Sequence, residues 1–230
     1  MPTAESASAT ETPITCEPFT ELARQVDAYV AMGYPALAGL TEDDFRALFA
    51  ILAGPLADAA AAGLNLAVTE SRVPFVAVVN DSVISPELRV PMLRVGGGKK
   101  EGILDRNYGE NGLAAYRAID GLGVPESPVY LLLDVQRGDE FKNIKPMNAT
   151  PVIAGRGRTV LTITEGLSYN AAFPDKLIKN HCFMLAGSHE GNRRVPAIWI
   201  SAGTPKLGWC FQGVEHTWLG IASAASRVAP

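Results

Sequence analysis

Three cysteines and three histidines are the residues of this 230-residue chain best suited to metal binding or nucleophilic catalysis. Cys182, Cys210 and His216 lie in its last quarter, with His181 and His189 close to them in sequence. A zinc site, a Cys–His nucleophilic pair and inert buried thiols are the three interpretations. Zinc sites usually carry paired ligands such as Cys-x-x-Cys, which the sequence lacks, so we expect no metal. If a metal is bound, its ligands would be Cys182, Cys210 and His216.

Three segments around these residues have the composition of β-strands: 197–201, 207–211 and 216–222. Together with 182–186 they predict an antiparallel β-meander over about 182–223. All three tryptophans of the chain fall in it, and the expected pairing sets Trp199 opposite Trp209, and Trp209 opposite Trp218. Residues directly opposite each other share one face, so the sequence predicts a row of indole rings across the sheet.

The predicted register also separates the cysteines from the histidine. His216 shares the tryptophan face and Cys210 points to the opposite face, which argues against a nucleophilic pair. Cys182 and Cys210 are two strands apart, roughly 10 Å at the usual strand spacing. A disulfide needs Cα atoms within about 7 Å. Buried, inert thiols are therefore the favoured interpretation.

Two polar loops, 188–194 and 212–215, should lie at the same end of the meander because strand direction alternates. Imidazole and carboxylate groups at this rim could transfer protons, so His216, Glu215 and His189 are the expected catalytic residues. Guanidinium, amide and indole groups would hold a ligand, with an anionic part on the arginines. The expected ligand-binding residues are Arg193, Arg194, Gln212, Trp209 and Trp218. The alternative is a solvated rim without function.

The composition is that of a globular protein, with 47% hydrophobic and 19% charged residues. The formal net charge of −4 is no basic excess, so nucleic acid is not expected as a partner. No apolar run reaches the roughly 18 residues of a membrane span, so no membrane partner is expected. The first residues lack the pattern of a secretory signal, and three widely spaced cysteines suggest no disulfide framework. We therefore expect a cytoplasmic protein.

The first quarter of the chain reads as a tail followed by helices. Residues 1–15 are small and polar, which is typical of a flexible tail. From about 18 to 62, the helical spacing of apolar residues predicts a helical arm that packs on the rest of the chain. Thr41 and Asp44 should cap its second helix, and Gly54-Pro55 should interrupt the last one.

The middle of the chain mixes both patterns. Strand periodicity occurs three times, at Val73–Val79, Val90–Val95 and Val129–Val135. The third segment is the most apolar and should be central in its sheet. Thr162 and Glu165 form a capping box for a helix over Ile163–Ala172. The glycine-rich stretch Val95–Lys100 lacks the spacing of a phosphate-binding loop. Helices, then mixed elements, then a meander predict an α+β fold, with one domain over 16–230.

Several motifs carry a resemblance to a known family: 185–188, 193–201, 205–210 and 216–220, which read LAGS, RRVPAIWIS, PKLGWC and HTWLG. Similarity extends upstream to 130–134, 161–166 and 33–39. The chain resembles an uncharacterised actinobacterial family known only as a domain of unknown function. The resemblance implies a bacterial cytoplasmic protein and transfers no activity, cofactor or site residue.

Two classes of function remain possible, and a third is less favoured. The rim would serve a small-molecule enzyme or ligand-binding protein, with His216 as acid/base and Arg194 as anion anchor. The alternative is a non-catalytic protein-interaction or self-assembling module, which leaves a homo-oligomer open. The third is a metal-binding protein that uses cysteine and histidine. A deep pocket with convergent polar groups would favour the first class, and an exposed apolar patch the second.

Overall fold

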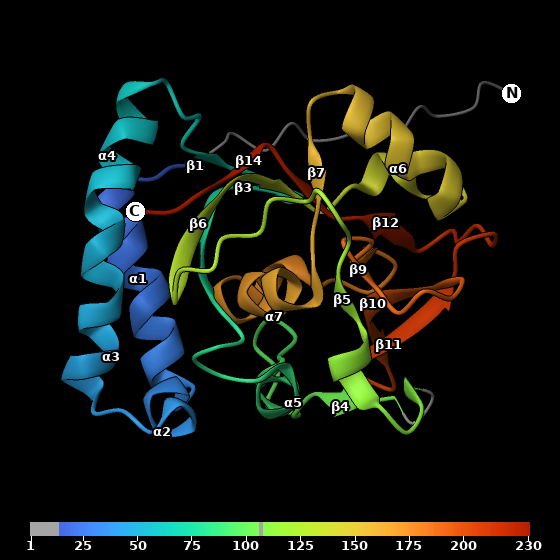
Figure 1. Ribbon diagram of the computed structural model, residues 1–230, viewed down its shortest axis with the longest axis horizontal. Helices are drawn as coiled ribbons and strands as arrows, with labels where there is room; N and C mark the ends of the chain where they lie inside the picture. The colour runs from blue at the N-terminus through green and yellow to red at the C-terminus, as the bar shows by residue number, and fades with distance from the viewer. Residues whose placement is uncertain (1–13, 106–107) are drawn as a thin grey trace, which may run out of the picture.

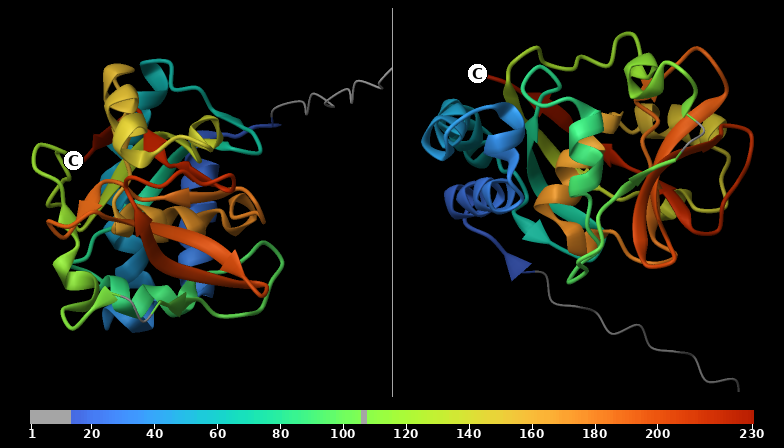
Figure 2. Two further views of the ribbon diagram at one scale, coloured as in Figure 1. Left: turned by 90° about the vertical axis from the view of Figure 1, so that its right-hand side faces the viewer. Right: turned by 90° about the horizontal axis from the view of Figure 1, so that it is seen from below.

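The structure, a computed structural model, describes residues 14–105 and 108–230. A helix, α7 (Ile163–Ala172), lies at the centre between two sheets (Figure 1, Figure 2). Thr162 and Glu165 form the predicted capping box. Thr162 Oγ1 accepts a hydrogen bond from the Glu165 N–H at 3.2 Å, and the Glu165 carboxylate accepts one from the Thr162 N–H at 2.7 Å. Every residue of α7 is buried, so the helix is part of the core.

One sheet is built around β6 (Val129–Gln136), the strand predicted to be central. β3 (Arg72–Val79) pairs with one edge of β6, and β13 (Ser223–Ala224) and β14 (Ser226–Val228) pair with its other edge. β7 (Thr159–Val160) extends the sheet beyond β13. The helical arm covers one face of this sheet and α7 the other (Figure 1). The first five residues of β6 are therefore buried, as the unbroken apolar run predicts.

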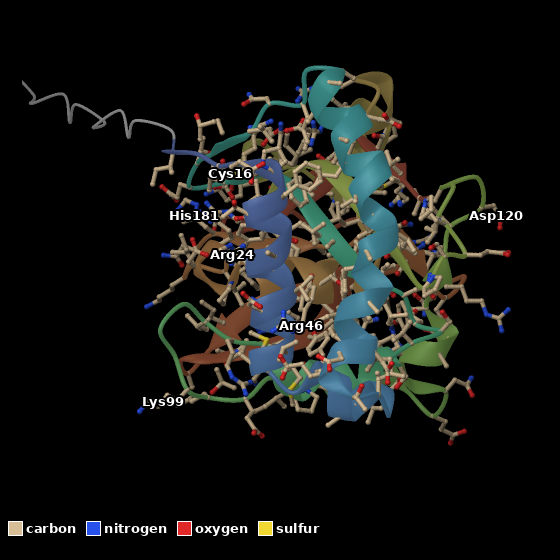
Figure 3. All side chains as sticks on the ribbon, turned by 90° about the vertical axis from the view of Figure 1, so that its left-hand side faces the viewer. Cys16, Arg24, Arg46, Lys99, Asp120 and His181 are labelled. Carbon is tan, nitrogen blue, oxygen red and sulfur yellow. The ribbon has the colours of Figure 1, made fainter. Side chains whose placement is uncertain are left out.

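The predicted helical arm comprises α1 (Pro18–Ala31), α2 (Tyr34–Ala38), α3 (Glu42–Leu48), the 3₁₀-helix η1 (Phe49–Leu52) and α4 (Ala53–Ala61). α1 and α4 run side by side on the outer face of the molecule (Figure 3). Thr41 caps α3 as predicted, because its Oγ1 accepts from the Asp44 N–H at 3.1 Å. The interruption predicted at Gly54-Pro55 is wrong. Pro55 falls in the first turn of α4, where its missing N–H costs no helical hydrogen bond.

The arm is fixed to β3 by buried polar side chains. Gln25 Nε2 donates to Phe75 O at 3.0 Å, and Gln25 Oε1 accepts from Ala77 N–H at 2.8 Å. Tyr29 donates to Ala77 O at 2.6 Å, and its ring stacks on Tyr34 with centroids 5.1 Å apart. These bonds satisfy buried backbone groups of β3 and orient the arm on the sheet.

The N-terminal end of the described chain is also paired. β1 (Ile14–Thr15) pairs with β2 (Ala67–Val68). The last two residues of the predicted tail therefore lie in a strand, and the other thirteen lie outside the described residues.

The second sheet contains the predicted meander with a changed order. Its strands run β12 (Leu219–Ile221), β8 (Cys182–Met184), β10 (Arg194–Ser201), β11 (Thr204–Phe211) and β4 (Ile103–Leu104). β8, β10 and β11 are antiparallel neighbours, as expected. β12 pairs in parallel with β8 instead of following β11. The third tryptophan segment therefore lies at the opposite edge of the sheet from the one predicted.

The β10–β11 register is shifted by three residues from the prediction. Trp199 lies opposite Lys206, and Trp209 lies opposite Pro196. Ala202 and Gly203 both have positive φ, 52° and 69°, and they form a two-residue turn where a five-residue loop was expected. An odd shift moves side chains to the other face, so Trp199 and Trp209 lie on opposite faces.

The tryptophans accordingly do not form the predicted row. The ring of Trp199 meets that of Trp218 edge-on, with centroids 6.4 Å apart. The ring of Trp209 packs against Phe211 at 5.0 Å, under the guanidinium of Arg194 at 4.2 Å. The indoles thus belong to two separate aromatic contacts.

The remaining elements connect these layers: α5 (Pro86–Arg89), η2 (Val90–Met92), η4 (Gly112–Ala115), β5 (Arg117–Ala118), η5 (Asp139–Phe141), α6 (Pro146–Gly155), η6 (Pro174–Lys176) and β9 (Ser188–His189). The strand predicted at Val90–Val95 is wrong, because this segment forms η2 and a loop. Pro91 lacks the N–H that a central strand would need. No helix among the described residues is long and apolar enough to cross a membrane.

Candidate functional site

The predicted rim brings some of its residues together. Gln212 N–H donates to Arg193 O at 2.9 Å, so the loops that hold these two residues do meet at one end of the β10–β11 hairpin. Arg194 lies over the Trp209 ring at 4.2 Å. His189 lies in β9 instead, opposite Arg117 of β5. The rim is therefore partly assembled, and His189 belongs to a different strand pair.

The expected catalytic histidine, His216, has no carboxylate partner among the described residues. Its ring is half-buried, packs edge-on against Trp218 with centroids 5.5 Å apart, and has a buried Nε2 without a hydrogen-bond partner among the described residues. Glu215 is exposed, and no ion pair within the described chain joins it to His216. An imidazole without such a partner is a weak arrangement for acid/base catalysis.

Burial also lowers the pKa of His216 below its ordinary value of 6.5. The unfolded chain therefore binds this proton more tightly than the folded protein does. Stability should be unaffected by this group well above pH 6.5 and should fall as the pH drops below it. We expect His216→Gln to flatten the fall in melting temperature between roughly pH 7 and pH 5. An imidazole NMR titration with a midpoint above 6.5 would contradict the expectation.

The cysteines do not assemble with His216. Cys182, Cys210 and His216 form no group of potential metal ligands in the described part of the chain. Burial raises the pKa of both thiols, that of Cys210 to about 12. Cys210 Sγ lies 3.2 Å from Met184 Sδ. Protonated thiols in apolar surroundings are poor nucleophiles and poor ligands.

A second polar cluster, Glu70, Asp139 and His181, holds three possible ligand atoms within 4.8 Å of one another. The fully buried Arg137 donates to Asp139 at 2.6 and 2.9 Å and to Glu70 at 3.1 Å. Lys142 Nζ lies 3.1 Å from His181 Nδ1. Burial alone would raise the pKa of Asp139, but hydrogen bonds from Arg137 and His181 outweigh it and lower the pKa. The cationic groups of Arg137 and Lys142 thus lie next to the possible ligand atoms and would repel a metal ion. The cluster therefore fits a salt-bridge network better than a metal site.

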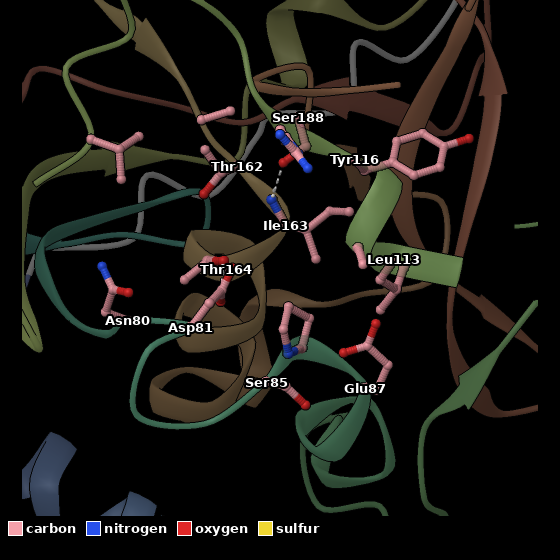
Figure 4. A pocket seen from close by; sticks show the side chains of 15 residues that line it. Asn80, Asp81, Ser85, Glu87, Leu113, Tyr116, Thr162, Ile163, Thr164 and Ser188 are labelled. Atoms are coloured by element: carbon pink, nitrogen blue, oxygen red, sulfur yellow. Dashed lines mark hydrogen bonds between the residues drawn. The ribbon is translucent and has the colours of Figure 1, made fainter. Parts of the chain in front are cut away.

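A cavity of about 430 Å³ opens at the N-terminal end of α7 (Figure 4). Side chains from five separate segments line it, so the fold and not any one motif creates it. Its volume is in the range of small-molecule sites. Its polar lining residues include Asp81, Ser85, Glu87, Arg117, Thr164 and Ser188.

The backbone of α7 is already largely capped at this cavity. The Ile163 N–H donates to Ser188 Oγ at 2.9 Å, and the Glu165 N–H donates to Thr162 Oγ1. Among the described residues, only the Thr164 N–H of this first turn lacks a partner. The helix terminus therefore leaves a ligand one backbone donor, and recognition must come mainly from side chains.

Asp81 is the most strongly positioned of these side chains. It follows β3 by two residues, and its Oδ1 accepts a 2.5 Å hydrogen bond from Thr164 Oγ1. The same oxygen accepts a hydrogen bond from Nη2 of Arg89, a fully buried side chain. Arg89 is itself held by Val79 O, to which its Nη1 donates at 2.7 Å. Figure 4 shows Asp81 next to Thr164 at the cavity. The carboxylate is thus held in one orientation by charge-assisted bonds.

Asp81 Oδ2 remains available to a ligand. It makes no hydrogen bond within the described part of the chain, and the Asp81 side chain is 50% exposed. Sequence reasoning missed this residue. Its partners Arg89 and Thr164 lie 8 and 83 positions away, so no local motif brings the three together.

The geometry defines the protein as an α+β protein with a cavity of about 430 Å³, lined by both polar and apolar residues, at the start of a buried central helix. A model of a family of unknown function, DUF5701, matches residues 28–230. The chain therefore belongs to this family, which agrees with the resemblance to a domain of unknown function. No curated protein and no solved structure matches the chain.

Proposed function

We propose that the protein binds a small polar molecule in the cavity at the start of α7, as a ligand-binding protein or as an enzyme. The observation that carries the proposal is the carboxylate of Asp81. A buried arginine and a threonine hold one of its oxygens, while the other makes no hydrogen bond within the described residues, and the residue lines the cavity. Such a fixed acceptor costs little reorganisation when a ligand hydroxyl or ammonium group binds. If the ligand reacts there, Asp81 is the group that would accept its proton.

The predicted rim contributes to this proposal only through His189. This residue lies opposite Arg117, which lines the cavity, in the β5–β9 pair. The other predicted residues border the β10–β11 hairpin. If these residues bind a ligand, they do so at a second site beside the hairpin. Two observations support such a site: Arg194 lies over the Trp209 ring, and the half-buried His216 packs against Trp218.

The proposal is tested by screening the full chain against a library of small polar metabolites by thermal shift, with calorimetry on each hit. Asp81→Asn should weaken binding of a true ligand at least about tenfold, because one charge-assisted hydrogen bond is lost. Asp120→Asn is the matched control, since this carboxylate is exposed (Figure 3) and does not line the cavity. Hits that bind both variants equally, with NMR shifts away from α7, would refute the cavity as the site.

The second candidate function is protein contact, and an exposed apolar patch favours it. Ile144, Met147, Phe211 and Val214 are between 38% and 53% exposed. They lie in neighbouring segments, because Met147 N–H donates to Gln212 O at 3.1 Å and Asn143 N–H donates to His216 O at 2.8 Å. Exposed apolar patches often mark contact surfaces.

For this second function we expect a concentration-dependent dimer in sedimentation velocity. The double variant Met147→Ser with Phe211→Ser should be monomeric at the same concentration, because it removes the two most exposed side chains of the patch. Ile51→Ser is the control, since Ile51 is 43% exposed on the helical arm. A wild-type protein that stays monomeric at high concentration would contradict self-assembly.

We also propose an actinobacterial, cytoplasmic origin. The sequence resemblance supports the first part. Cys16, Cys182 and Cys210 are all free thiols, which is typical of a reducing compartment and supports the second.

A further inference from the structure

Two side chains of opposite charge line the cavity without pairing. Glu87 comes from α5 and Arg117 from β5. Within the described chain neither forms an ion pair or a side-chain hydrogen bond, so their charged atoms are more than 4.0 Å apart. Both residues are exposed to solvent. The cavity therefore presents a free carboxylate and a free guanidinium at the same time.

The two charges come from different walls. Glu87 follows Ser85 on the segment after β3, the same segment that supplies Asp81. Arg117 follows Tyr116 and pairs in β5 with His189, the neighbour of Ser188. Figure 4 shows Ser85 and Glu87 on one side of the cavity, and Tyr116 and Ser188 on the other. A ligand in the cavity would thus lie between an acidic wall and a basic wall.

The charges around the cavity also balance. Asp81, Glu87 and Arg117 line it, and the buried Arg89, which does not line the cavity, compensates the charge of Asp81 through their hydrogen bond. A purely cationic ligand would leave Arg117 unsatisfied, and a purely anionic one would face two carboxylates. A ligand that carries both charges satisfies both walls, and a guanidinium binds a carboxylate in bidentate fashion.

We propose, on the basis of the proposed function, that the cavity takes a small zwitterion of the amino-acid class. The ammonium group of the ligand lies between Glu87 and the free Oδ2 of Asp81. Its carboxylate lies at Arg117. The two charged groups of the ligand thus fix its orientation in the cavity.

The test is isothermal calorimetry on the full chain with free α-amino acids and γ-aminobutyrate, each beside its carboxamide and its N-acetyl derivative. At least one free amino acid should bind, and both derivatives should bind at least about tenfold more weakly. Arg117→Gln should abolish the preference for the free acid over the carboxamide. Glu87→Gln should abolish the preference over the N-acetyl form. Arg156→Gln and Glu126→Gln, which change exposed charges outside the cavity, should keep both preferences.

The outcomes separate this inference from the proposed function. A cavity ligand from the metabolite library that lacks either charge would overturn the zwitterion and leave ligand binding intact. Carboxamides that bind as tightly as the free amino acids would also overturn the zwitterion and leave ligand binding intact. If neither the library nor the amino-acid panel yields an Asp81-dependent ligand, both proposals fail.

Discussion

Replacing Glu165 with alanine should lower the free energy of unfolding by about 3 to 5 kcal/mol, the cost of leaving a buried charge without its partner. That partner is Arg227 of β14, whose Nε and Nη2 donate to the two carboxylate oxygens at 2.5 and 2.8 Å. The Glu165 side chain is fully buried, and that of Arg227 is 3% exposed. In a chain of this length the melting temperature should fall by on the order of 10 °C in a thermal melt.

The effect should be large because one carboxylate serves three elements. Besides Arg227, Glu165 accepts hydrogen bonds from the Thr162 N–H at 2.7 Å and from Tyr130 of β6 at 3.0 Å. It thus joins the cap of α7 to the centre of one sheet and to the C-terminal strand. Glu140→Ala is the control, because Glu140 is half-exposed and lies 3.8 Å from an equally exposed Arg156. A loss for Glu165→Ala that is no larger than that of the control would contradict the argument.

The contacts of Glu165 show which interactions can be predicted from the sequence and which cannot. The capping box at Thr162 and Glu165 is local, so three residues of spacing were enough to predict α7 and its cap. The pairing of Glu165 with Arg227 spans 62 residues and depends on β14 lying along β6. The α+β class and the central position of β6 follow from periodicity and apolar composition. Long-range ion pairs have no such periodic signal.

The candidate site was hidden for the same reason. The predicted rim relied on residue types gathered in one stretch of sequence, whereas the cavity combines segments that are far apart. One signal was present: Arg89 stands close to the apolar Val90 and Val95, and a buried arginine demands an acidic partner. Asp81, two residues past the end of a predicted strand, is the first acid after that strand. The sequence does not show that Arg89 is buried, so this pair could be identified only once the fold was known.

Gly208→Ala should destabilise the protein by about 1 to 3 kcal/mol, because the new methyl group overpacks a filled site. In the observed register Gly208 lies opposite Ala197, and the indole of Trp199 covers it. An added Cβ would stand 2.1 Å from Cη2 and 2.7 Å from Cζ3 of that ring, so the ring would have to move. Chemical denaturation measures the loss. Gly213→Ala is the control, because a Cβ there meets nothing within 4 Å and should change stability by less than about 0.5 kcal/mol.

A double-mutant cycle makes this a test of the register itself. In a Trp199→Leu background the ring is gone, so Gly208→Ala should cost much less, with a coupling energy of at least about 1 kcal/mol. The register that sets Trp199 opposite Trp209 puts Gly208 on the other face of the sheet, where the two substitutions would be independent. Additive losses would therefore favour the longer loop over the tight Ala202-Gly203 turn. Coupled losses would confirm the observed register, in which the positive-φ residues Ala202 and Gly203 form the turn between β10 and β11.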